Sequence, residues 1–177
     1  MKILVISDTH GELSNLELVI RILGPDLDFL IHLGDGARDL ERLPRELVHT
    51  IPHLQVKGNM DSDARLPPSR VTEAGGHRLY LSHGHAALAS GSPLPMILAA
   101  REAGASACLF GHTHVPHKSY SDGLLVLNPG SLSRPRNGRS PSFALLTVPD
   151  NGTGRIEAGL YEILDGRDGP SFYAIDL

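Results

Sequence analysis

The sequence opens with "KILVIS" (residues 2–7), a short apolar run rich in β-branched residues. A run of this kind is typical of a β-strand that is buried on both faces. A helical pattern follows, in which Ser14 and Glu17 match a capping box and the Gly-Pro pair at 24–25 ends the helix. The next apolar run, "DFLIHLG" (28–34), predicts a second strand. Strand, helix and strand in this order predict a βαβ unit with parallel strands.

The rest of the chain alternates strands and hairpins with one further helix. Gly-Gly and Asp-Gly pairs between apolar runs predict antiparallel hairpins. The predicted elements are a strand at 54–58, hairpins at 70–84, 117–130 and 142–164, a strand at 107–111, and a helix from Ser92-Pro93 to Gly104. The end, 166–177, fits either an extra strand or a tail. Together these elements predict a mixed α/β fold with a central sheet flanked by helices.

Length and composition predict one domain over residues 1–177, because domains commonly have roughly 100–200 residues. The single cysteine, Cys108, excludes a disulfide within the chain, which fits a reducing compartment. The N-terminus does not resemble a signal peptide, and no apolar stretch approaches the roughly 20 residues that span a bilayer. We therefore expect a soluble, cytoplasmic protein without membrane association.

Each predicted strand is followed by a side chain that can bind a metal ion. In chain order these are Asp8 and His10, Asp35, Asn59, His83, and finally His112 and His114. Singly, each has an ordinary explanation as a helix cap, a turn residue or a structural hydrogen-bonding group. Five such coincidences at five strand ends are hard to accept. Because α/β proteins build sites at the carboxyl ends of strands, we expect these groups to converge.

The chemistry of this set is coherent. Two carboxylates, one amide oxygen and four imidazoles, without a thiolate, fit Mn, Fe, Co, Ni or Zn. Seven side chains exceed what one tetrahedral zinc needs, and they match two ions that share a bridging carboxylate. Two-metal sites, with ions roughly 3.5–4 Å apart, serve displacement at phosphorus.

The motifs "SDTHG", "GDG", "GNMD", "SHGH", "GHTH" and "NPGS", in this order and spacing, resemble those of the calcineurin-like metallophosphoesterases. The resemblance is closest to the compact bacterial and archaeal phosphodiesterase branch, which also includes the metal-poor retromer scaffold subunit of eukaryotes. It spans about residues 1–148, and the motifs are specific jointly, not singly. It implies a four-layer αββα sandwich of two mixed β-sheets flanked by helices.

The resemblance also implies a binuclear centre of two divalent ions, with Mn²⁺ expected and Ni²⁺, Co²⁺, Fe²⁺ or Zn²⁺ as alternatives. It assigns Asp8, His10 and His114 to the first ion, Asn59, His83 and His112 to the second, and Asp35 to the bridge between them. A hydroxide that bridges the ions would attack the phosphorus of a phosphate diester. Asp35 and Asn59 thereby take part in catalysis.

The third motif departs from the family's commonest form. Many relatives have a histidine after the Gly-Asn pair that interacts with the leaving group or the substrate phosphate, whereas this chain has Met60. Because methionine cannot donate a proton, we expect a preference for diesters with good leaving groups over monoesters. His85 is a candidate substitute donor, with a purely structural role as the alternative. Asp61 is expected to orient a ligand histidine.

Three arginines, Arg134, Arg136 and Arg139, follow the "NPGS" turn, which lies beside the metal site in the family. We expect Arg134 and Arg136, with Asn59, to contact the substrate's phosphate or another anionic group. A solvated basic loop is the plainer explanation for any one of these arginines. The remaining histidines, among them His32, match no ligand position and are expected to be structural or surface residues.

These observations favour a metal-dependent phosphodiesterase that acts on a small diester. Two alternatives stay open: a protein-interaction scaffold on the same fold, which needs no full ligand set, and a phosphomonoesterase or nucleotidase. The net charge of −4 and an aromatic content of 5% give no sign of a nucleic-acid surface, without excluding one. Neither the physiological substrate nor a homo-oligomeric state is determined by the sequence.

Overall fold

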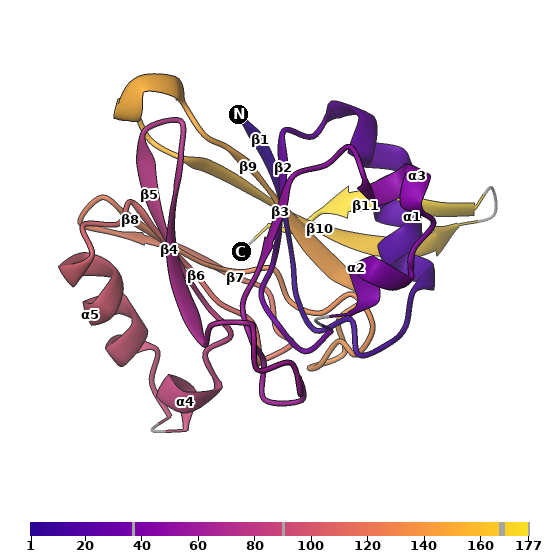
Figure 1. The fold of residues 1–177 in the computed structure, drawn as a ribbon, viewed down its shortest axis with the longest axis horizontal. Coiled ribbons are helices and arrows are strands. Elements are labelled where there is room, and N and C mark those ends of the chain that lie inside the picture. Colours follow the sequence, from indigo (N-terminus) through magenta and orange to yellow (C-terminus); the bar gives the residue numbers. More distant parts are fainter. Residues whose placement is uncertain (37, 90, 167–168, 177) are drawn as a thin grey trace.

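The computed structural model describes residues 1–36, 38–89, 91–166 and 169–176. Two β-sheets pack face to face, with helices on both outer sides (Figure 1). The larger sheet contains, in spatial order, β11 (Gly169–Ala174), β10 (Glu157–Gly166), β9 (Ser142–Thr147), β1 (Lys2–Ile6), β2 (Phe29–His32) and β3 (His53–Gln55). The smaller sheet contains β4 (Ser69–Ala74), β5 (His77–Ser82), β6 (Ala107–Leu109), β8 (Leu124–Asn128) and β7 (His117–Ser121). The predicted sandwich of two mixed sheets is confirmed.

Both sheets combine parallel and antiparallel pairing. In the larger sheet β1, β2 and β3 pair in parallel, whereas β9, β10 and β11 are antiparallel additions. In the smaller sheet β5, β6 and β8 are parallel, and the antiparallel strands β4 and β7 form its edges. The predicted βαβ unit and all three hairpins are therefore present. Strand β11 shows that the end of the chain adds a strand and is not a tail.

Helix α1 (Ser14–Leu23) covers the outer face of the larger sheet. Its buried residues Leu16, Val19 and Ile20 pack with apolar side chains of β1 and β2. The predicted capping box is wrong, because Ser14 is already the first helical residue and no side chain caps the helix. Glu17 instead forms an ion pair with Arg21 at 2.6 Å. A 3-10 turn (Gly24–Asp26) follows directly.

Helix α5 (Leu94–Glu102) covers the smaller sheet. The chain leaves the helix through Gly104, whose φ of +64° suits glycine, and the backbone N–H groups of Gly104 and Ala105 donate to the carbonyls of Arg101 and Ala100. The remaining helices are single turns: α2 (Asp39–Arg42), α3 (Arg45–Val48), α4 (His85–Leu88) and a 3-10 turn (Asp150–Gly152). They are too short to show a helical period, which explains why the sequence did not predict them.

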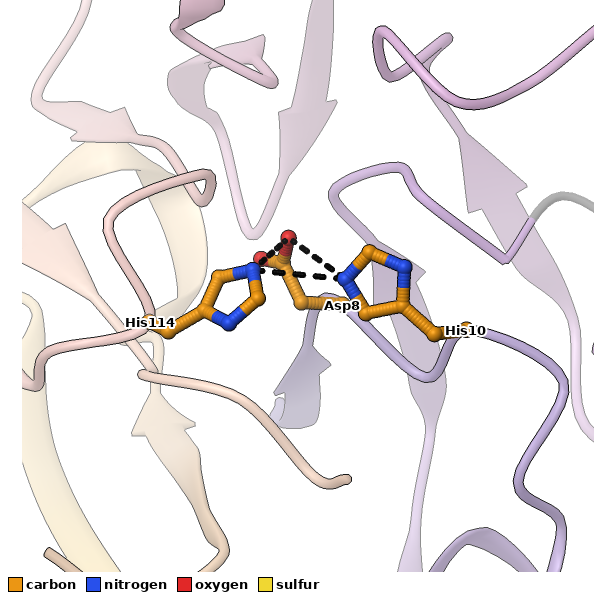
Figure 2. Close-up of side chains that lie close together, drawn as sticks. All are labelled: Asp8, His10 and His114. Atoms are coloured by element: carbon orange, nitrogen blue, oxygen red, sulfur yellow. Dashed lines mark hydrogen bonds and ion pairs between the residues drawn. The ribbon is translucent and has the colours of Figure 1, made fainter. Parts of the chain in front are cut away.

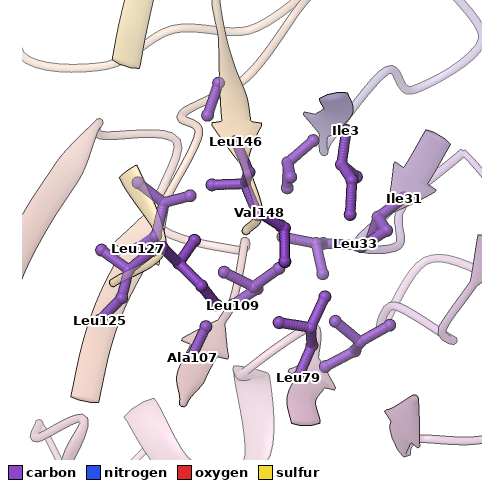
Figure 3. Close-up of a cluster of buried hydrophobic side chains, with 14 of the residues drawn as sticks. Ile3, Ile31, Leu33, Leu79, Ala107, Leu109, Leu125, Leu127, Leu146 and Val148 are labelled. Carbon is purple, nitrogen blue, oxygen red and sulfur yellow. The ribbon is translucent and has the colours of Figure 1, made fainter. Parts of the chain in front are cut away.

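The main core lies between the two sheets (Figure 3). Ile3 and Val5 of β1 point into it, whereas Leu4 and Ile6 point to the opposite face and pack under α1. This alternation explains why "KILVIS" is apolar at consecutive positions. Cys108 belongs to a separate core under α5, where burial raises the pKa of its thiol to about 12. In the part of the chain that the structure describes, no helix is long and apolar enough to cross a membrane.

Candidate metal centre

The loops after β1, β2, β3, β5 and β6 meet at one end of the sandwich, because the parallel strands of each sheet end there. Backbone hydrogen bonds tie these loops together. Asp8 N–H donates to the Gly34 carbonyl at 3.0 Å, and His10 N–H donates to the Asp35 carbonyl at 2.9 Å. In the smaller sheet Gly111 N–H donates to the carbonyl of His83 at 3.1 Å. The predicted convergence of the strand-end residues is confirmed.

The backbone of this region adopts an uncommon conformation. Five of the seven predicted ligands have a left-handed backbone: Asp8, His10, Asp35, His112 and His114, with φ of 56°, 46°, 56°, 67° and 60°. Few non-glycine residues adopt this conformation, although Asp and His tolerate it better than most. Residues in sparsely populated backbone regions gather at functional sites, where the surrounding structure holds them in place.

Asp8, His10 and His114 form the first group of metal-capable atoms (Figure 2). Nε2 of His114 lies 3.0 Å from Oδ1 of Asp8, and Nε2 of His10 lies 3.7 Å from the same oxygen. The two ring nitrogens are 3.3 Å apart. The three side chains come from the loops after β1 and β6, and their donor atoms face one another.

The two carboxylate oxygens of Asp8 have different environments. Oδ2 accepts hydrogen bonds from the Ser7 hydroxyl at 2.6 Å and from the backbone N–H of His112 at 3.0 Å. Oδ1 is buried and accepts no hydrogen bond of good geometry from the described residues, although imidazole nitrogens approach it. A buried carboxylate oxygen without a donor is costly unless a cation balances it. Oδ1 is therefore directed at a place that suits a positive ion.

Asp8, Asp35 and His83 form the second group. Nε2 of His83 lies 3.4 Å from Oδ2 of Asp35 and 3.2 Å from Oδ1 of Asn59. The opposite ring nitrogen, Nδ1, donates to the carbonyl of Leu33 at 2.8 Å, because a carbonyl can only accept. Nε2 therefore has its lone pair free for a cation, which is the arrangement of a metal-binding histidine.

His114 has the same arrangement, since its Nδ1 donates to the carbonyl of Arg134 at 2.6 Å. The carboxylate common to both groups is Asp8. Asp35, the predicted bridge, belongs to the second group, and its Oδ1 accepts from the backbone N–H of Met60 at 2.7 Å. The bridging role of Asp35 stays a prediction.

His112 and His85 lie at the edge of these groups. The ring of His112 is 5.2 Å from that of His83, in an edge-to-face arrangement. The ring of His85 is 5.6 Å from that of His83, but His85 lines a neighbouring cavity together with Tyr80 and Met96. His112 is thus placed beside the second group, whereas His85 does not line the cavity over the donor atoms.

The charges of the site favour ionised carboxylates. Burial raises the pKa of Asp8, but the close approach of His114 and the charge of His83 more than offset it, so its pKa lies below the ordinary value. Asp35 follows the same pattern, with His83 as the main stabilising neighbour. Conversely, burial lowers the pKa of His83, and Asp35 and Asp8 raise it to a net increase. Both carboxylates therefore have the form that binds a cation at neutral pH.

Asp61 holds two of the loops together. Its carboxylate accepts from the backbone N–H groups of Asp35 at 2.9 Å, Gly36 at 3.0 Å and Gly58 at 2.8 Å. The predicted action of Asp61 on a ligand histidine stays a prediction. Gly58 approaches Asp35 so closely that a Cβ there would overlap the Asp35 carboxylate, which explains the glycine of "GNMD".

A buried network under the site was missed by the sequence analysis. The backbone N–H of Gly34 donates to Nδ1 of His32 at 3.1 Å, so Nε2 carries the proton toward the Thr9 hydroxyl, also 3.1 Å away. Thr9 in turn donates to Oδ2 of Asp39 at 2.6 Å. Burial lowers the pKa of His32 to about 4. The only signal in the sequence was a histidine within an apolar strand.

A cavity of about 450 Å³ lies over the donor atoms. Its lining includes five of the seven predicted metal ligands, Met60, and the predicted substrate residues Arg134 and Arg136. Arg139 does not line it and pairs with Glu162 at 3.5 Å. The "NPGS" turn is anchored beside the cavity, because the Asn128 amide donates to the Gly111 carbonyl at 2.7 Å.

Residues 1–151 match the family model of the calcineurin-like phosphoesterase superfamily domain. The chain belongs to this superfamily. It is 31% identical to the probable metallophosphoesterase YsnB of Bacillus subtilis, over 85% of this chain and 86% of that protein. It is 29% identical to the phosphodiesterase YfcE of Escherichia coli, over 82% of this chain and 87% of that protein.

The fold is shared with a solved structure of Vps29 from Chaetomium thermophilum, with a TM-score of 0.76 and 21% identity over 98% of this chain and 95% of that one. At this identity the likeness shows the fold alone. The family is one of metal-dependent phosphoesterases, and the donor groups around Asp8 fit that chemistry.

Proposed function

We propose that this protein is a binuclear metal-dependent phosphodiesterase that hydrolyses a small phosphate diester. The buried Oδ1 of Asp8 carries this proposal. It accepts no hydrogen bond of good geometry from the residues that the structure describes, and Nε2 atoms of His114, His10 and His83 lie 3.0, 3.7 and 4.0 Å from it. With Asp35 and Asn59 alongside, the atoms divide into two overlapping groups of nitrogen and oxygen donors, which fit two ions of the Mn²⁺ type.

Two divalent ions bound there would lower the pKa of a water molecule and neutralise charge on the phosphoryl oxygens. The chain itself supplies fixed geometry. Carbonyl groups hold His83 and His114 by their Nδ1 atoms, and Asp61 fixes the loops that carry Asp35 and Asn59. Such positioning lowers the activation free energy, because the groups around the substrate are already oriented before the reaction begins.

In the proposed reaction a water oxygen forms a bond to phosphorus while the bond from phosphorus to the leaving oxygen breaks. The products are a phosphate monoester and an alcohol, and the proton of the water ends on the alcohol. Arg134 and Arg136 line the cavity and would bind the phosphoryl oxygens. Met60 lines the same cavity but offers no proton, which favours diesters whose leaving group can depart as an anion and take up its proton afterwards.

The alternatives have less support. The likeness to Vps29 extends to the fold only, and a scaffold has no need of the donor groups around Asp8. A phosphomonoesterase is disfavoured by Met60. The name of the relative YfcE, a phosphodiesterase, supports the diester reaction. We propose His85 as the proton source for the leaving group, from its position in the neighbouring cavity.

Hydrolysis of bis(p-nitrophenyl) phosphate and of p-nitrophenyl phosphate tests the proposal. Metal-stripped protein receives Mn²⁺, Ni²⁺, Co²⁺, Zn²⁺ or Mg²⁺ in turn. We expect metal-dependent cleavage of the diester, slower cleavage of the monoester, and loss of at least about a hundredfold in Asp35→Asn. Asp26→Asn, on the exposed 3-10 turn, is the matched control and should retain activity. Folded protein that cleaves neither ester with any metal would turn the assignment toward the scaffold.

A further inference from the structure

A second cavity joins the first at the candidate metal centre. It measures about 310 Å³ and is lined by His10, Gly11, Asp35, Gly36, Arg38, Asp39, Met60, Asp61 and Arg134. Four residues line both cavities: His10, Asp35, Met60 and Arg134. Met60 lines both cavities and is 68% exposed, so the two spaces adjoin at this residue. A substrate held over the donor atoms can therefore extend past Met60 toward Arg38.

The guanidinium groups around these cavities form no close ion pair with the described residues, although the charge of Arg38, after the stronger effect of the hydrogen bonds from Arg65, helps to lower the pKa of Asp63. Within the described residues, the side chains of Arg38, Arg134 and Arg136 take part in no hydrogen bond or ion pair. Several arginines elsewhere are paired, as Arg65 is with Asp63 at 2.6 Å and Arg101 with Asp122 at 2.7 Å, and what distinguishes the cleft is that three free guanidinium groups line adjoining cavities. Three unpaired cations therefore gather at the cleft.

The acidic residues of the second cavity accept hydrogen bonds from groups other than these arginines. Asp39 already accepts from the Thr9 hydroxyl, from the Gly11 N–H at 2.8 Å and from Arg42 at 3.1 Å. Asp61 already accepts from three backbone N–H groups. Asp35 belongs to the candidate metal centre. The guanidinium N–H donors of Arg38 and Arg134 are therefore available to an external anion.

We propose that the second cavity binds a further phosphate group of the substrate, between Arg38 and Arg134. The inference rests on the proposed function and names the substrate class: a phosphodiester that carries another phosphate on one of its two arms. A simple diester has one negative charge, whereas the cleft combines three unpaired guanidinium groups with the ions of the metal centre. Guanidinium groups bind phosphate by charge-assisted hydrogen bonds, and they favour the more highly charged substrate.

Two chromogenic esters that differ in one group test this assignment. They are the p-nitrophenyl ester of thymidine 5′-phosphate and the same ester with an added 3′-phosphate. With Mn²⁺-loaded protein we expect kcat/KM to be about tenfold higher for the 3′-phosphorylated ester, the size expected of one or two charge-assisted hydrogen bonds. Arg38→Gln should bring the ratio of the two kcat/KM values close to one.

Arg45→Gln is the matched control for the loss of one positive charge. Arg45 lines a separate cavity near α3 that shares no residue with the two at the metal centre. This variant should keep the wild-type ratio. A ratio near one in the wild type, or a ratio that Arg38→Gln leaves unchanged, would overturn the assignment.

Calorimetry supplies a readout that does not depend on turnover. We expect thymidine 3′,5′-bisphosphate to bind the Mn²⁺-loaded protein about tenfold more tightly than thymidine 5′-phosphate, and Arg38→Gln to remove the difference. Equal affinities in the wild type would contradict the second phosphate site. If neither ester is cleaved with any metal, the phosphodiesterase proposal fails, and the calorimetric comparison still decides whether the anion site exists.

Discussion

The backbone and the side chain of Met60 have different roles at the candidate metal centre. The backbone N–H of Met60 donates to Oδ1 of Asp35 at 2.7 Å, and any residue except proline would supply this bond. The side chain instead faces both cavities and is largely exposed. The substitution of this side chain can therefore change the reaction without disturbing the loop that carries Asn59.

We expect Met60→His to raise kcat/KM for p-nitrophenyl phosphate by at least about tenfold, because general acid catalysis by a positioned imidazole contributes this much or more. Hydrolysis of the monoester by Mn²⁺-loaded protein is the measurement. Met60→Gln is the control, since its amide is polar but is not a general acid. An equal rise in both variants, or no rise in either, would contradict an acid role for this position.

His32 links stability to pH. Burial lowers its pKa to about 4, against an ordinary value of 6.5, although Asp61, Asp8 and Asp39 oppose the shift. Between these values the unfolded chain takes up a proton that the folded protein does not. The contribution of His32 to the free energy of unfolding is therefore fully present above about pH 6.5 and is lost as the pH falls toward 4.

In metal-free protein we expect the free energy of unfolding to fall over this pH window, with roughly 3 kcal/mol from His32 alone. Urea unfolding between pH 4 and 7 measures it. His32→Gln keeps polar atoms near Thr9 and Gly34 but cannot titrate, so its pH dependence should be shallower. Parallel curves for the two proteins would show that His32 does not set this dependence.

At the scale of the elements, the strands were predictable and the loops were not. A continuous or alternating apolar pattern identified each strand up to β10, and the Gly-Gly and Asp-Gly turns identified the hairpins. The sequence predicted that Ser14 caps the N-terminus of α1, and this was wrong. Leu13 precedes the helix with a backbone that is already helical, and no side chain accepts a hydrogen bond there. The one-turn helices gave no periodic signal.

The loops of the metal centre depend on close backbone packing. A Cβ at Gly58 would overlap the carboxylate of Asp35, and the backbone N–H of Asp35 lies equally near. We expect Gly58→Ala to weaken Mn²⁺ binding at least about tenfold and to destabilise the protein by about 1–3 kcal/mol, because the Asp35 loop must move. Calorimetric titration with Mn²⁺ and thermal unfolding measure the two effects.

Gly24→Ala is the matched control for this substitution. Gly24 lies outside the Asp35 loop in the sequence, and an added Cβ would meet the side chains of Ile51 and Ile20, at 3.1 and 3.6 Å. This variant can lose stability through its contact with Ile51 and the following proline, but it should bind Mn²⁺ normally, so metal binding is the property that the two variants compare. A Gly58→Ala protein that behaves like the control would show that the approach of Gly58 to Asp35 is not needed for metal binding.

At the scale of the whole molecule, both sheets contribute side chains to one core, so we expect the protein to unfold as a single domain. Leu109 of β6 lies in this core with no exposed surface, among side chains of both sheets (Figure 3). We expect Leu109→Ala to lower the free energy of unfolding by about 2–5 kcal/mol and to keep one cooperative transition. Leu98→Ala, at a side chain that is 56% exposed, should change stability little.

Far-UV circular dichroism and tyrosine fluorescence can follow this unfolding. Tyr80 and Tyr120 belong to the smaller sheet, and Tyr161 and Tyr173 belong to the larger one. Coincident transitions by both probes are the expected result, in the wild type and in Leu109→Ala. Two separated transitions would show that the sheets unfold independently and that the single-domain prediction is wrong.

The sequence by itself determined which residues form the strands and which metal-capable side chains follow them. Both are local properties, since the apolar period fixes a strand and the next few residues must form its loop. The motif order then indicated the family, and with it the sandwich. The chemistry of the donors, oxygen and nitrogen without sulfur, was also fixed at this level.

Only the tertiary structure decided which atoms meet. Asp8 and His112 are separated by 104 residues, yet the order of the strands brings the His112 N–H to Oδ2 of Asp8 and leaves Oδ1 free for a cation. The same packing placed Arg38 beside the metal centre and buried His32 beneath it. Such contacts depend on how distant loops are oriented by two packed sheets, and no short stretch of sequence contains that information.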